Sequence, residues 1–244
     1  MILGIQQKKV RWLCIVTLLF LTITVIIFAD NRRLPQQFVS LDVKSAPVLM
    51  IDAGHGGLDG GAVGVNAVLE SDINLALAEK LECLAQFFGY GVLMTRERAE
   101  LDYPEELSTI REKKVWDQKR RVEMINRCDG AVLISIHQNN YPDSRPRGPQ
   151  VFYAATEGSL QLAEELNDLL SSALAPDSRR LAAPISKKIY LMNQVHCTAV
   201  LVECGFLSNP DEARQLTEDP YQRKLAMLLL RGYGTYVAEA REAA

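Results

Sequence analysis

The sequence predicts an α/β fold, with one domain built on a twisted, mostly parallel (mixed) sheet that carries helices on both faces. Two observations support this class. Short apolar runs alternate along the chain with longer segments whose apolar residues recur every three or four positions. The chain has 244 residues, of which 48% are hydrophobic and 23% charged, and this composition suits one globular domain with a single core.

A transmembrane or signal helix is predicted ahead of that domain. An apolar run at 12–29 holds no charged residue, and Lys8, Lys9 and Arg11 precede it. Its length lies between that of a signal-peptide core and that of a full membrane span. Because Ile27 is a poor residue for a signal-peptidase site, an uncleaved membrane anchor is favoured over a cleaved signal.

The chain therefore divides into an anchor or signal at 1–33, a linker at 34–47 and a catalytic domain at 48–240. The basic residues ahead of the apolar run place the N-terminus inside the cell and the rest of the chain outside. Five of the 27 basic residues but one of the 30 acidic residues lie in the first segment, so the remainder is more acidic than the whole chain, whose net charge is −3. An acidic ectodomain argues against nucleic acid or anionic lipid as its partner.

The first predicted strand, at 48–51, is apolar and leads into Asp52 and a glycine-rich loop. The helix expected after the loop, at 70–88, has one apolar stripe, and Gly89 ends it. The stripe consists of Ile73, Leu77, Leu81, Leu84 and Phe88. A second buried strand is expected at 90–95.

The middle of the chain predicts one helix and two strands. In order, it comprises a charged surface loop at 97–118, a helix at about 117–127, a strand at 131–136, a proline-rich loop at 141–149 and a strand at 150–154.

The last third predicts two further helices and two strands. A long helix begins at Ser159, a short strand follows at 189–192, the last strand lies at 198–202 and a helix at 220–240 closes the chain. Strands that alternate with helices in this way indicate a parallel sheet covered on both faces.

Four polar side chains stand at the ends of these elements. His55 lies in the glycine loop after the first strand, and Glu70 opens the helix that follows. His137 and Glu203 each come directly after an apolar strand. Because the ligand crevice of an open α/β sheet lies at the carboxyl ends of its strands, we expect the four to meet.

The chemistry of this set indicates metal-assisted hydrolysis. Two neutral imidazoles and one carboxylate form a three-ligand zinc set that leaves a fourth position open to water. A second, uncoordinated carboxylate can then act as base and proton shuttle. Each residue also has an ordinary alternative, since a histidine after a strand often caps a loop and a glutamate at a helix start often serves the helix dipole. Glu203 is harder to explain in that way, because a carboxylate behind an apolar run needs a partner.

The glycine loop and the cysteines predict no other cofactor. Residues 54–59 begin like the dinucleotide fingerprint G-x-G-x-x-G but have Asp59 where the third glycine belongs, and no phosphate-loop G-K-[ST] follows. The glycines are instead expected to turn the backbone tightly and present His55. The five cysteines include no C-x-x-C and indicate buried single thiols rather than a disulfide framework. They are Cys14, Cys83, Cys128, Cys197 and Cys204, of which Cys83 is expected on an apolar helix face.

Several motifs, taken together, carry a family resemblance. They are IDAGHGGLDGGAVG at 51–64, Glu70 with Asp72 and Asn74, TRE at 95–97, Arg121 with Asn126 and Asp129, SIHQN at 135–139 and VECGFLSNPDE at 202–212. With them the chain resembles the zinc-dependent N-acetylmuramoyl-L-alanine amidases of the cell-wall-hydrolase type. The motifs span nearly the whole catalytic domain, and the set is specific although no single motif is.

The resemblance implies hydrolysis of the amide bond between N-acetylmuramic acid and the L-alanine of peptidoglycan stem peptides. It implies His55, Glu70 and His137 as the ligands of one zinc ion and Glu203 as the catalytic carboxylate. Asn139 matches an asparagine that follows the second histidine in the family, where it would contact the substrate, support a metal ligand or play a plain structural part. Arg96 also matches and is expected to be structural.

A closer resemblance is suggested by the layout of the chain and by the run KKIYLMNQV at 187–195. Both are similar to the germination-specific spore-cortex amidases. That similarity implies a role in cortex maturation toward muramic-δ-lactam and, in a spore former, a location between the membranes around the forespore. Peptidoglycan is then the partner, the membrane is contacted through 12–29, and the sequence does not decide between a monomer, a homodimer and a complex with an accessory protein.

Two alternative functions stay open at this point. The first is a zinc peptidase that cuts a different bond, because the ligand set alone specifies no more than hydrolysis of an amide. The second is a wall-binding protein with a silent site, against which the intact His55, Glu70, His137 and Glu203 argue.

Overall fold

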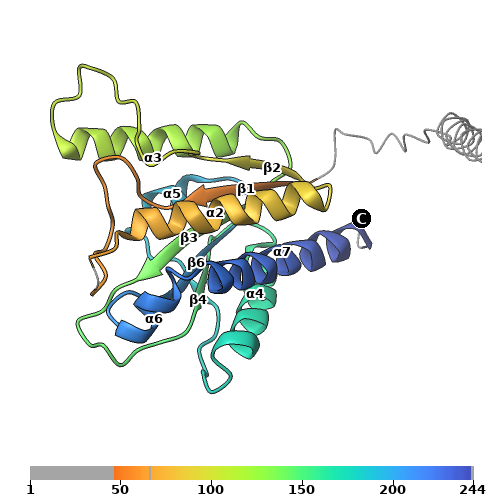
Figure 1. Cartoon of the computed structure of the whole chain (residues 1–244). Helices are drawn as coiled ribbons and strands as arrows, with labels where there is room; N and C mark the ends of the chain where they lie inside the picture. The colour runs from red at the N-terminus through yellow and green to blue at the C-terminus, as the bar shows by residue number, and fades with distance from the viewer. Residues whose placement is uncertain (1–46, 66, 243–244) are drawn as a thin grey trace, which may run out of the picture. The chain divides into compact units, whose positions relative to one another are not determined.

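A computed structural model describes residues 47–65 and 67–242 of the chain, and its centre is a six-stranded sheet (Figure 1). The strands are β1 (Val48–Ala53), β2 (Gly91–Met94), β3 (Ala131–Asn139), β4 (Gln150–Tyr153), β5 (Ala183–Pro184) and β6 (Thr198–Phe206). Their order across the sheet is β2-β1-β3-β6-β4-β5. All neighbours are parallel except β4, which runs antiparallel to β6, so the predicted mixed, mostly parallel sheet is confirmed.

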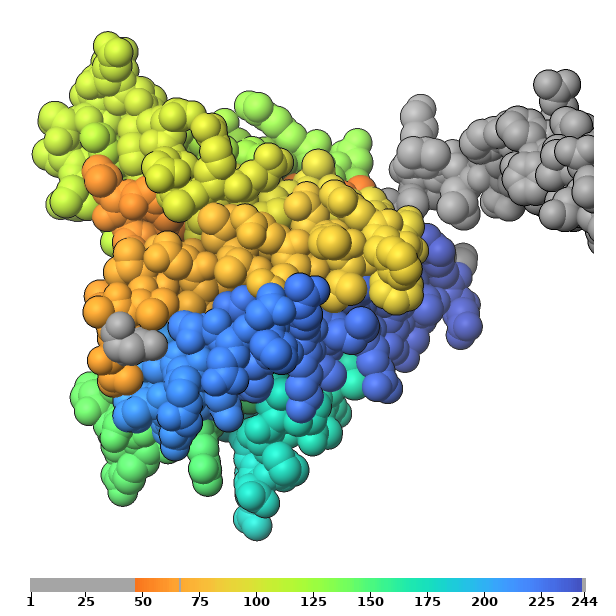
Figure 2. Space-filling view, viewed as in Figure 1, coloured from red at the N-terminus to blue at the C-terminus, as the bar shows by residue number. Residues whose placement is uncertain are grey.

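Helices cover both faces of this sheet. They are α2 (Glu70–Phe87), α3 (Ile110–Asn126), α4 (Ser159–Leu174), α5 (Tyr190–Gln194), α6 (Pro210–Gln215) and α7 (Asp219–Glu242). The main core lies beneath α2, α4 and α7, and a smaller core lies beneath α3 and α5 on the other face. Figure 2 shows α2 and α7 as adjoining bands on one surface of the molecule.

The central strands are apolar on both sides because each face of the sheet is buried. Along β1, Leu49 and Ile51 point into the main core, whereas Met50 between them points into the smaller one. This alternation is the two-residue period of a strand. It explains why β1, β3 and β6 read as continuous apolar runs in the sequence.

Helix α3 is longer than predicted and begins at Ile110 rather than near 117. Thr109 caps its N-terminus: its side chain accepts the backbone N–H of Glu112, whose carboxylate in turn accepts the N–H of Thr109. The first two turns bury no residue, since Asp117, Arg121 and Ile125 are the buried positions. Without an apolar stripe, that stretch gave no periodic signal in the sequence.

The strand predicted at 189–192 is wrong, because this segment leads into the short helix α5. The backbone N–H of Asn193 donates to Ile189, and that of Val195 donates to Leu191. Leu191 and Met192 are adjacent in sequence and both buried, at 7% and 2% exposure. Adjacent residues of a strand point to opposite faces, whereas Leu191 and Met192 both pack into the smaller core, as neighbours in a helical turn can.

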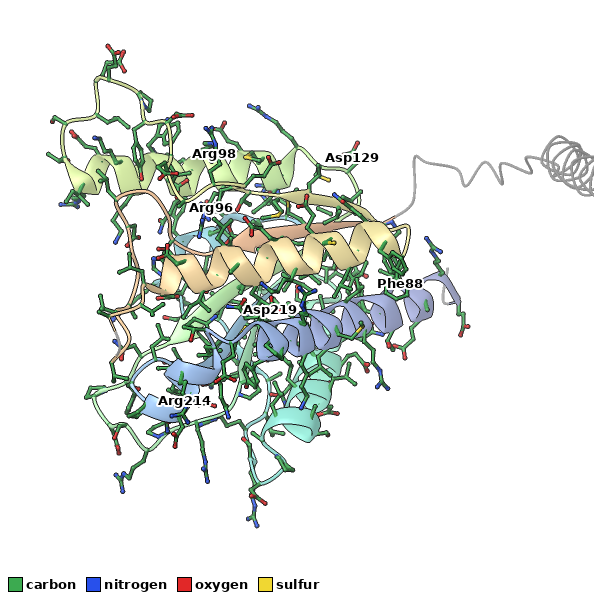
Figure 3. All side chains as sticks on the ribbon, in the orientation of Figure 1. Phe88, Arg96, Arg98, Asp129, Arg214 and Asp219 are labelled. Atoms are coloured by element: carbon green, nitrogen blue, oxygen red, sulfur yellow. The ribbon has the colours of Figure 1, made fainter. Side chains whose placement is uncertain are left out.

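Two expectations about α2 also need correction. The apolar stripe is buried at Ile73, Leu77 and Leu81, but Phe88 after the helix end is 56% exposed and Cys83 is exposed as well. The register explains Phe88, because Gly91 pairs with Val48, the first residue of β1. Phe88 thus lies beyond the end of α2 and ahead of the first paired residue of β2, where Figure 3 labels it.

The predicted anchor lies outside the described residues, as does nearly all of the linker. Within 47–65 and 67–242, no helix combines the length and the apolar character needed to cross a bilayer. Four of the five cysteines belong to the described part, and all four are free thiols, of which Cys204 is buried.

Candidate metal centre and active site

Three of the four predicted side chains converge at the carboxyl ends of β1 and β3. His55 comes from the loop after β1, Glu70 is the first residue of α2, and His137 lies near the end of β3. One ligand atom from each of the three lies within 4.8 Å of the others. Glu70 Oε1 is 3.2 Å from His55 Nε2 and 3.0 Å from His137 Nδ1, so the two imidazoles face a single carboxylate oxygen.

His55 is presented by an unusual backbone. Its φ is 61°, a left-handed conformation that non-glycine residues rarely adopt, and Gly56 and Gly57 continue the turn with positive φ. Arg121 stabilises this turn by donating from its guanidinium to the carbonyl oxygen of His55. The sequence prediction that glycines present His55 is therefore met by the geometry.

A carboxylate that sequence reasoning missed orients the ring of His55. Asp59 Oδ2 lies 3.1 Å from His55 Nδ1, which leaves Nε2 to face Glu70. A carboxylate on the far nitrogen is the usual partner of a metal-binding histidine. Burial lowers the pKa of His55, but its hydrogen bonds to Asp59 and Glu70 outweigh this and raise that pKa to about 9.

Both oxygens of Glu70 are engaged by the surrounding chain. Oε2 accepts the backbone N–H of Ala62 at 2.9 Å, and Oε1 accepts that of Gln138 at 3.1 Å. Asn74, one helical turn later, donates to Gly54 O and receives a hydrogen bond from the Gln138 side chain. Burial raises the pKa of Glu70, but its hydrogen bonds to His137 and His55 dominate and hold that pKa well below its usual range.

His137 is packed against the backbone of Gly54. A Cβ at position 54 would lie 2.4 Å from the Cε1 and Nε2 atoms of His137. No side chain fits in that space, so glycine is required there by close approach rather than by its torsion angles. The loop after β1 thus supplies one imidazole and the wall that positions the other.

Glu203 lies next to His137, although it is not at the end of its strand. The two residues are register partners in β3 and β6, and β6 continues to Phe206, past the predicted end at 202. Within the described part of the chain, Glu203 Oε2 is buried and has no hydrogen-bond partner. Burial raises the pKa of this carboxyl to about 7.

Asn139 follows a register shift in β3 after His137. Its backbone carbonyl accepts the N–H of Leu207, while its side chain has no hydrogen bond among the described residues. Its predicted role in supporting a ligand or contacting substrate stays a prediction.

Buried ion pairs fix the loop beneath the site. Asp52, at the end of β1, accepts hydrogen bonds from Thr95, Ser135 and Arg121. The buried guanidinium of Arg96 donates to the carbonyls of Ala53, Gly54 and Ser71, which agrees with its expected structural role.

A pocket opens beside the two imidazoles. It lies between the loop at 54–59, helix α3 and the segment 188–192, with Tyr103 and Tyr190 on its walls. Its cationic side chains are matched by acidic ones. Lys114, Arg121 and Lys188 stand against Asp52, Asp59 and Asp117.

The donor set fits a zinc ion. Two imidazole nitrogens and one carboxylate oxygen match the three protein ligands of a catalytic zinc site. The donors converge, each is oriented by a further hydrogen bond or by close packing, and the adjacent pocket leaves a side of the site open.

Comparison with known proteins places these features in context. The family model described as N-acetylmuramoyl-L-alanine amidase matches residues 49–233. The germination-specific N-acetylmuramoyl-L-alanine amidase of Bacillus subtilis is 34% identical over 237 residues, which cover 96% of this chain and 98% of the relative.

Solved structures are similar over the same region. The CwlD amidase of Clostridioides difficile, in complex with the GerS lipoprotein, is 35% identical with a TM-score of 0.75, covering 79% of this chain and 98% of that one. The catalytic domain of CwlV, an N-acetylmuramoyl-L-alanine amidase from Bacillus (Paenibacillus) polymyxa, is 26% identical with a TM-score of 0.65, covering 79% and 98%.

Proposed function

The chain belongs to the family of N-acetylmuramoyl-L-alanine amidases and acts on peptidoglycan, and we propose that it does so as a zinc enzyme of the spore cortex. His55, Glu70 and His137 hold the zinc ion in this proposal. Glu203 is the catalytic carboxylate, and the amide between the lactyl group of N-acetylmuramic acid and L-alanine is the bond that is cut.

The observation that carries the proposal is the meeting of these four side chains. Three of them bring donor atoms within 4.8 Å of one another, and the fourth is the register partner of His137 with a buried, unpartnered oxygen. An unsatisfied buried carboxylate oxygen is costly, and a substrate or water beside it removes that cost.

His55, Glu70 and His137 would hold the zinc ion, which when bound would supply Lewis-acid chemistry and lower the pKa of water toward about 7. Glu203 takes a proton from the attacking water and delivers it to the alanine nitrogen as the amide bond breaks. Burial raises the pKa of the Glu203 carboxyl above its usual range, which favours a group that both accepts and donates a proton. Asp59 and Gly54 keep the two imidazoles in place during these steps.

The cortex role and the location of the protein belong to the same proposal. The cortex role is supported by similarity to a relative named germination-specific and by the single-domain layout. The structure of CwlD with a lipoprotein suggests a lipoprotein partner for this chain too. The apolar run at 12–29 and the basic residues before it suggest a membrane-anchored protein outside the cytoplasm.

Digestion of purified peptidoglycan tests the bond and the metal together. The full-length chain should contain about one zinc ion per molecule and release stem peptides that begin with L-alanine, as identified by mass analysis. Cleavage within the peptide would instead indicate a zinc peptidase. Binding to the wall without cleavage would indicate a silent site.

Complementation tests the cortex role separately. Expression of the chain in a Bacillus subtilis strain that lacks its germination-specific amidase should restore muramic-δ-lactam to the spore cortex. Active enzyme without lactam in such spores would leave the amidase intact and overturn the cortex assignment.

A further inference from the structure

A groove lined by arginines lies on the rim of the active-site end, away from the pocket beside the imidazoles. Three segments form it: the loop before β4, the loop between α4 and β5, and α6, which carries the Arg214 labelled in Figure 3. Its arginines are Arg145, Arg147, Arg179, Arg180 and Arg214, and its acidic residues are Asp177, Asp211 and Glu212. We call it the arginine groove.

The charge of this groove contrasts with that of the chain. Five arginines against three carboxylates make it cationic, whereas the whole chain has a net charge of −3. Arg145 pairs with Asp143, and Arg214 pairs with Asp211. Arg147 and Arg179 are exposed and form no salt bridge within the described residues, so two guanidinium groups are available to an anion.

Buried contacts fix the walls of the arginine groove. The carboxylate of Glu212 accepts the backbone N–H of Gly148 at 2.7 Å and that of Phe206 at 2.8 Å, which joins the three segments α6, β6 and the loop before β4. Arg180 donates to the carbonyl of Gly148 and lies over the ring of Phe206, 5.1 Å from its centroid. The free arginines therefore project from a fixed frame.

The register connects the arginine groove to the active site. Gln150 pairs with Glu203 across β4 and β6, and Gly148 precedes Gln150 by two residues. A strand advances about 3.3 Å per residue and neighbouring strands lie about 4.8 Å apart, so the groove wall begins within about 10 Å of the Glu203 backbone. An extended peptide covers that distance in about three residues.

We propose that the arginine groove binds the free carboxylates of the stem peptide beyond its L-alanine, through Arg147 and Arg179. This inference rests on the proposed function, in which the stem peptide is the leaving group, and it adds that this peptide carries free carboxylates beyond its L-alanine. Guanidinium groups form strong paired hydrogen bonds with carboxylates. The pocket beside the imidazoles suits this task less well, since its three cations face three carboxylates and Lys114 is already 2.9 Å from Asp59.

The test compares two soluble substrates that differ by one charge. One is N-acetylmuramoyl-L-alanyl-D-glutamate, and the other carries an amide in place of the α-carboxylate of the glutamate. We expect the full-length chain to prefer the free acid by about tenfold in kcat/KM, mainly through KM, with the preference shrinking as salt rises. The Arg147→Gln, Arg179→Gln double variant should lose the preference and cleave the two substrates with equal kcat/KM.

Arg127→Gln is the matched control, because Arg127 is an exposed arginine at the end of α3, far from the groove in the fold. This variant removes one arginine charge outside the groove and should keep the preference for the free-acid substrate. The thermal unfolding temperature should be unchanged in every variant. Equal cleavage of the two substrates by the unaltered chain overturns the inference and leaves the amidase intact. A double variant that retains the full preference also overturns it. If the chain cleaves neither of the two soluble substrates nor whole peptidoglycan, the proposed function is overturned, and this inference with it.

Discussion

One oxygen, Oε1 of Glu70, is the point on which the candidate metal centre is assembled. It faces nitrogens of His55 and His137 and accepts the backbone N–H of Gln138. Glu70 also stands in the first turn of α2, where the helix dipole favours a carboxylate. Glu70 can therefore interact with the helix dipole and also serve as a metal ligand, because Oε2 accepts the N–H of Ala62 while Oε1 remains turned toward the imidazoles.

Replacing Gly54 by alanine should damage the site without unfolding the protein. The new Cβ would lie 2.4 Å from the imidazole of His137, so the ring must turn away from Glu70. We expect zinc content and amidase activity to fall together, with activity at least tenfold lower. Gly91→Ala is the control, since a Cβ there would meet only Val48 at 3.7 Å. Full zinc occupancy in Gly54→Ala protein would contradict this account of the glycine.

The two carboxylates should respond differently to loss of charge. Glu203→Gln keeps the shape of the side chain but cannot carry a proton, so we expect retained zinc and a loss of turnover of about 10²–10⁴-fold. Glu70→Gln should lose zinc and activity together. Metal analysis and muropeptide release, measured side by side, separate the two outcomes. Zinc lost from the Glu203 variant and kept in the Glu70 variant would mean that the two roles are exchanged.

The residues at the centre were visible in the sequence, whereas those that orient them were not. His137 and Glu203 stand out because each follows an apolar run directly, and His55 stands out because it lies in the glycine loop after one. Asp59 lies in a loop where an acidic residue is ordinary, and its contact with His55 exists only because the left-handed turn folds back. Gln138 is buried beside Glu70 by the alternation of β3, which depends on the register of the folded sheet.

At the scale of elements, a buried ion pair ties α3 to the end of β1. Arg121 donates to Asp52, to Asp117 and to the carbonyls of Ala53 and His55. Arg121 was recognised from the sequence through the family motif, but apart from Asp117 in the same helix its partners lie in β1 and the loop after it, far along the chain. The first turns of α3 are exposed to solvent. The ion pair thus connects this helix to β1, the strand that leads into the site.

The Asp52 carboxyl should make stability depend on pH in the acid range. Burial raises its pKa, but Arg121, Ser135 and Thr95 together lower it from 3.8 to about 2. The folded state therefore binds fewer protons than the unfolded state between these values. The resulting stabilisation of about 2 kcal/mol is complete above about pH 4 and is lost as the pH falls toward 2.

Urea unfolding of the metal-free protein between pH 6 and pH 2.5 measures this contribution. Asp52→Asn should be less stable by about 2–3 kcal/mol at pH 6, because it removes one of the two carboxylates that face the buried Arg121 and leaves Asp117 as the other. The gap between the variant and the unaltered chain should narrow by about 2 kcal/mol as the pH falls. A gap that stays constant over this range would show that Asp52 does not titrate as described.

Elements were predicted well where an apolar pattern was present and poorly where it was absent. The helix at 70–87 and strands β1, β3 and β6 follow from their patterns. The start of α3 is fixed by the Thr109 cap rather than by buried side chains, and α5 is a short apolar run, which periodicity alone cannot assign to helix or strand. The antiparallel direction of β4 depends on pairing with β6, which sequence patterns do not specify.

At the scale of the whole molecule, the site and the start of the domain lie at opposite ends of the sheet. The metal centre, the adjoining pocket and the arginine groove are at the carboxyl ends of the parallel strands. The chain enters β1 at the other end, where Tyr233 donates its hydroxyl to the carbonyl of Pro47.

The topology of the full chain is the prediction that belongs to this scale. Lys8, Lys9 and Arg11 precede the apolar run and should remain in the cytoplasm, which carries the domain to the other side of the membrane. A reporter that is active only outside the cytoplasm, fused after Ala244, should therefore be active. Replacing the three basic residues by glutamine should lower that activity, because Arg32 and Arg33 beyond the run then compete for the inside.

The matched control replaces Arg32 and Arg33 by glutamine. This change leaves the apolar run at 12–29 intact and increases the excess of positive charge before the run over that after it. Its reporter activity should equal or exceed that of the unaltered chain. The size of the membrane-bound protein decides between the two forms of the N-terminus: a full-length product indicates an anchor, and a product starting near Asp30 indicates a cleaved signal. If this fusion is inactive, and a fusion to a second reporter that works only in the cytoplasm is active, the amidase lies on the side of the membrane without peptidoglycan and the proposed location is wrong.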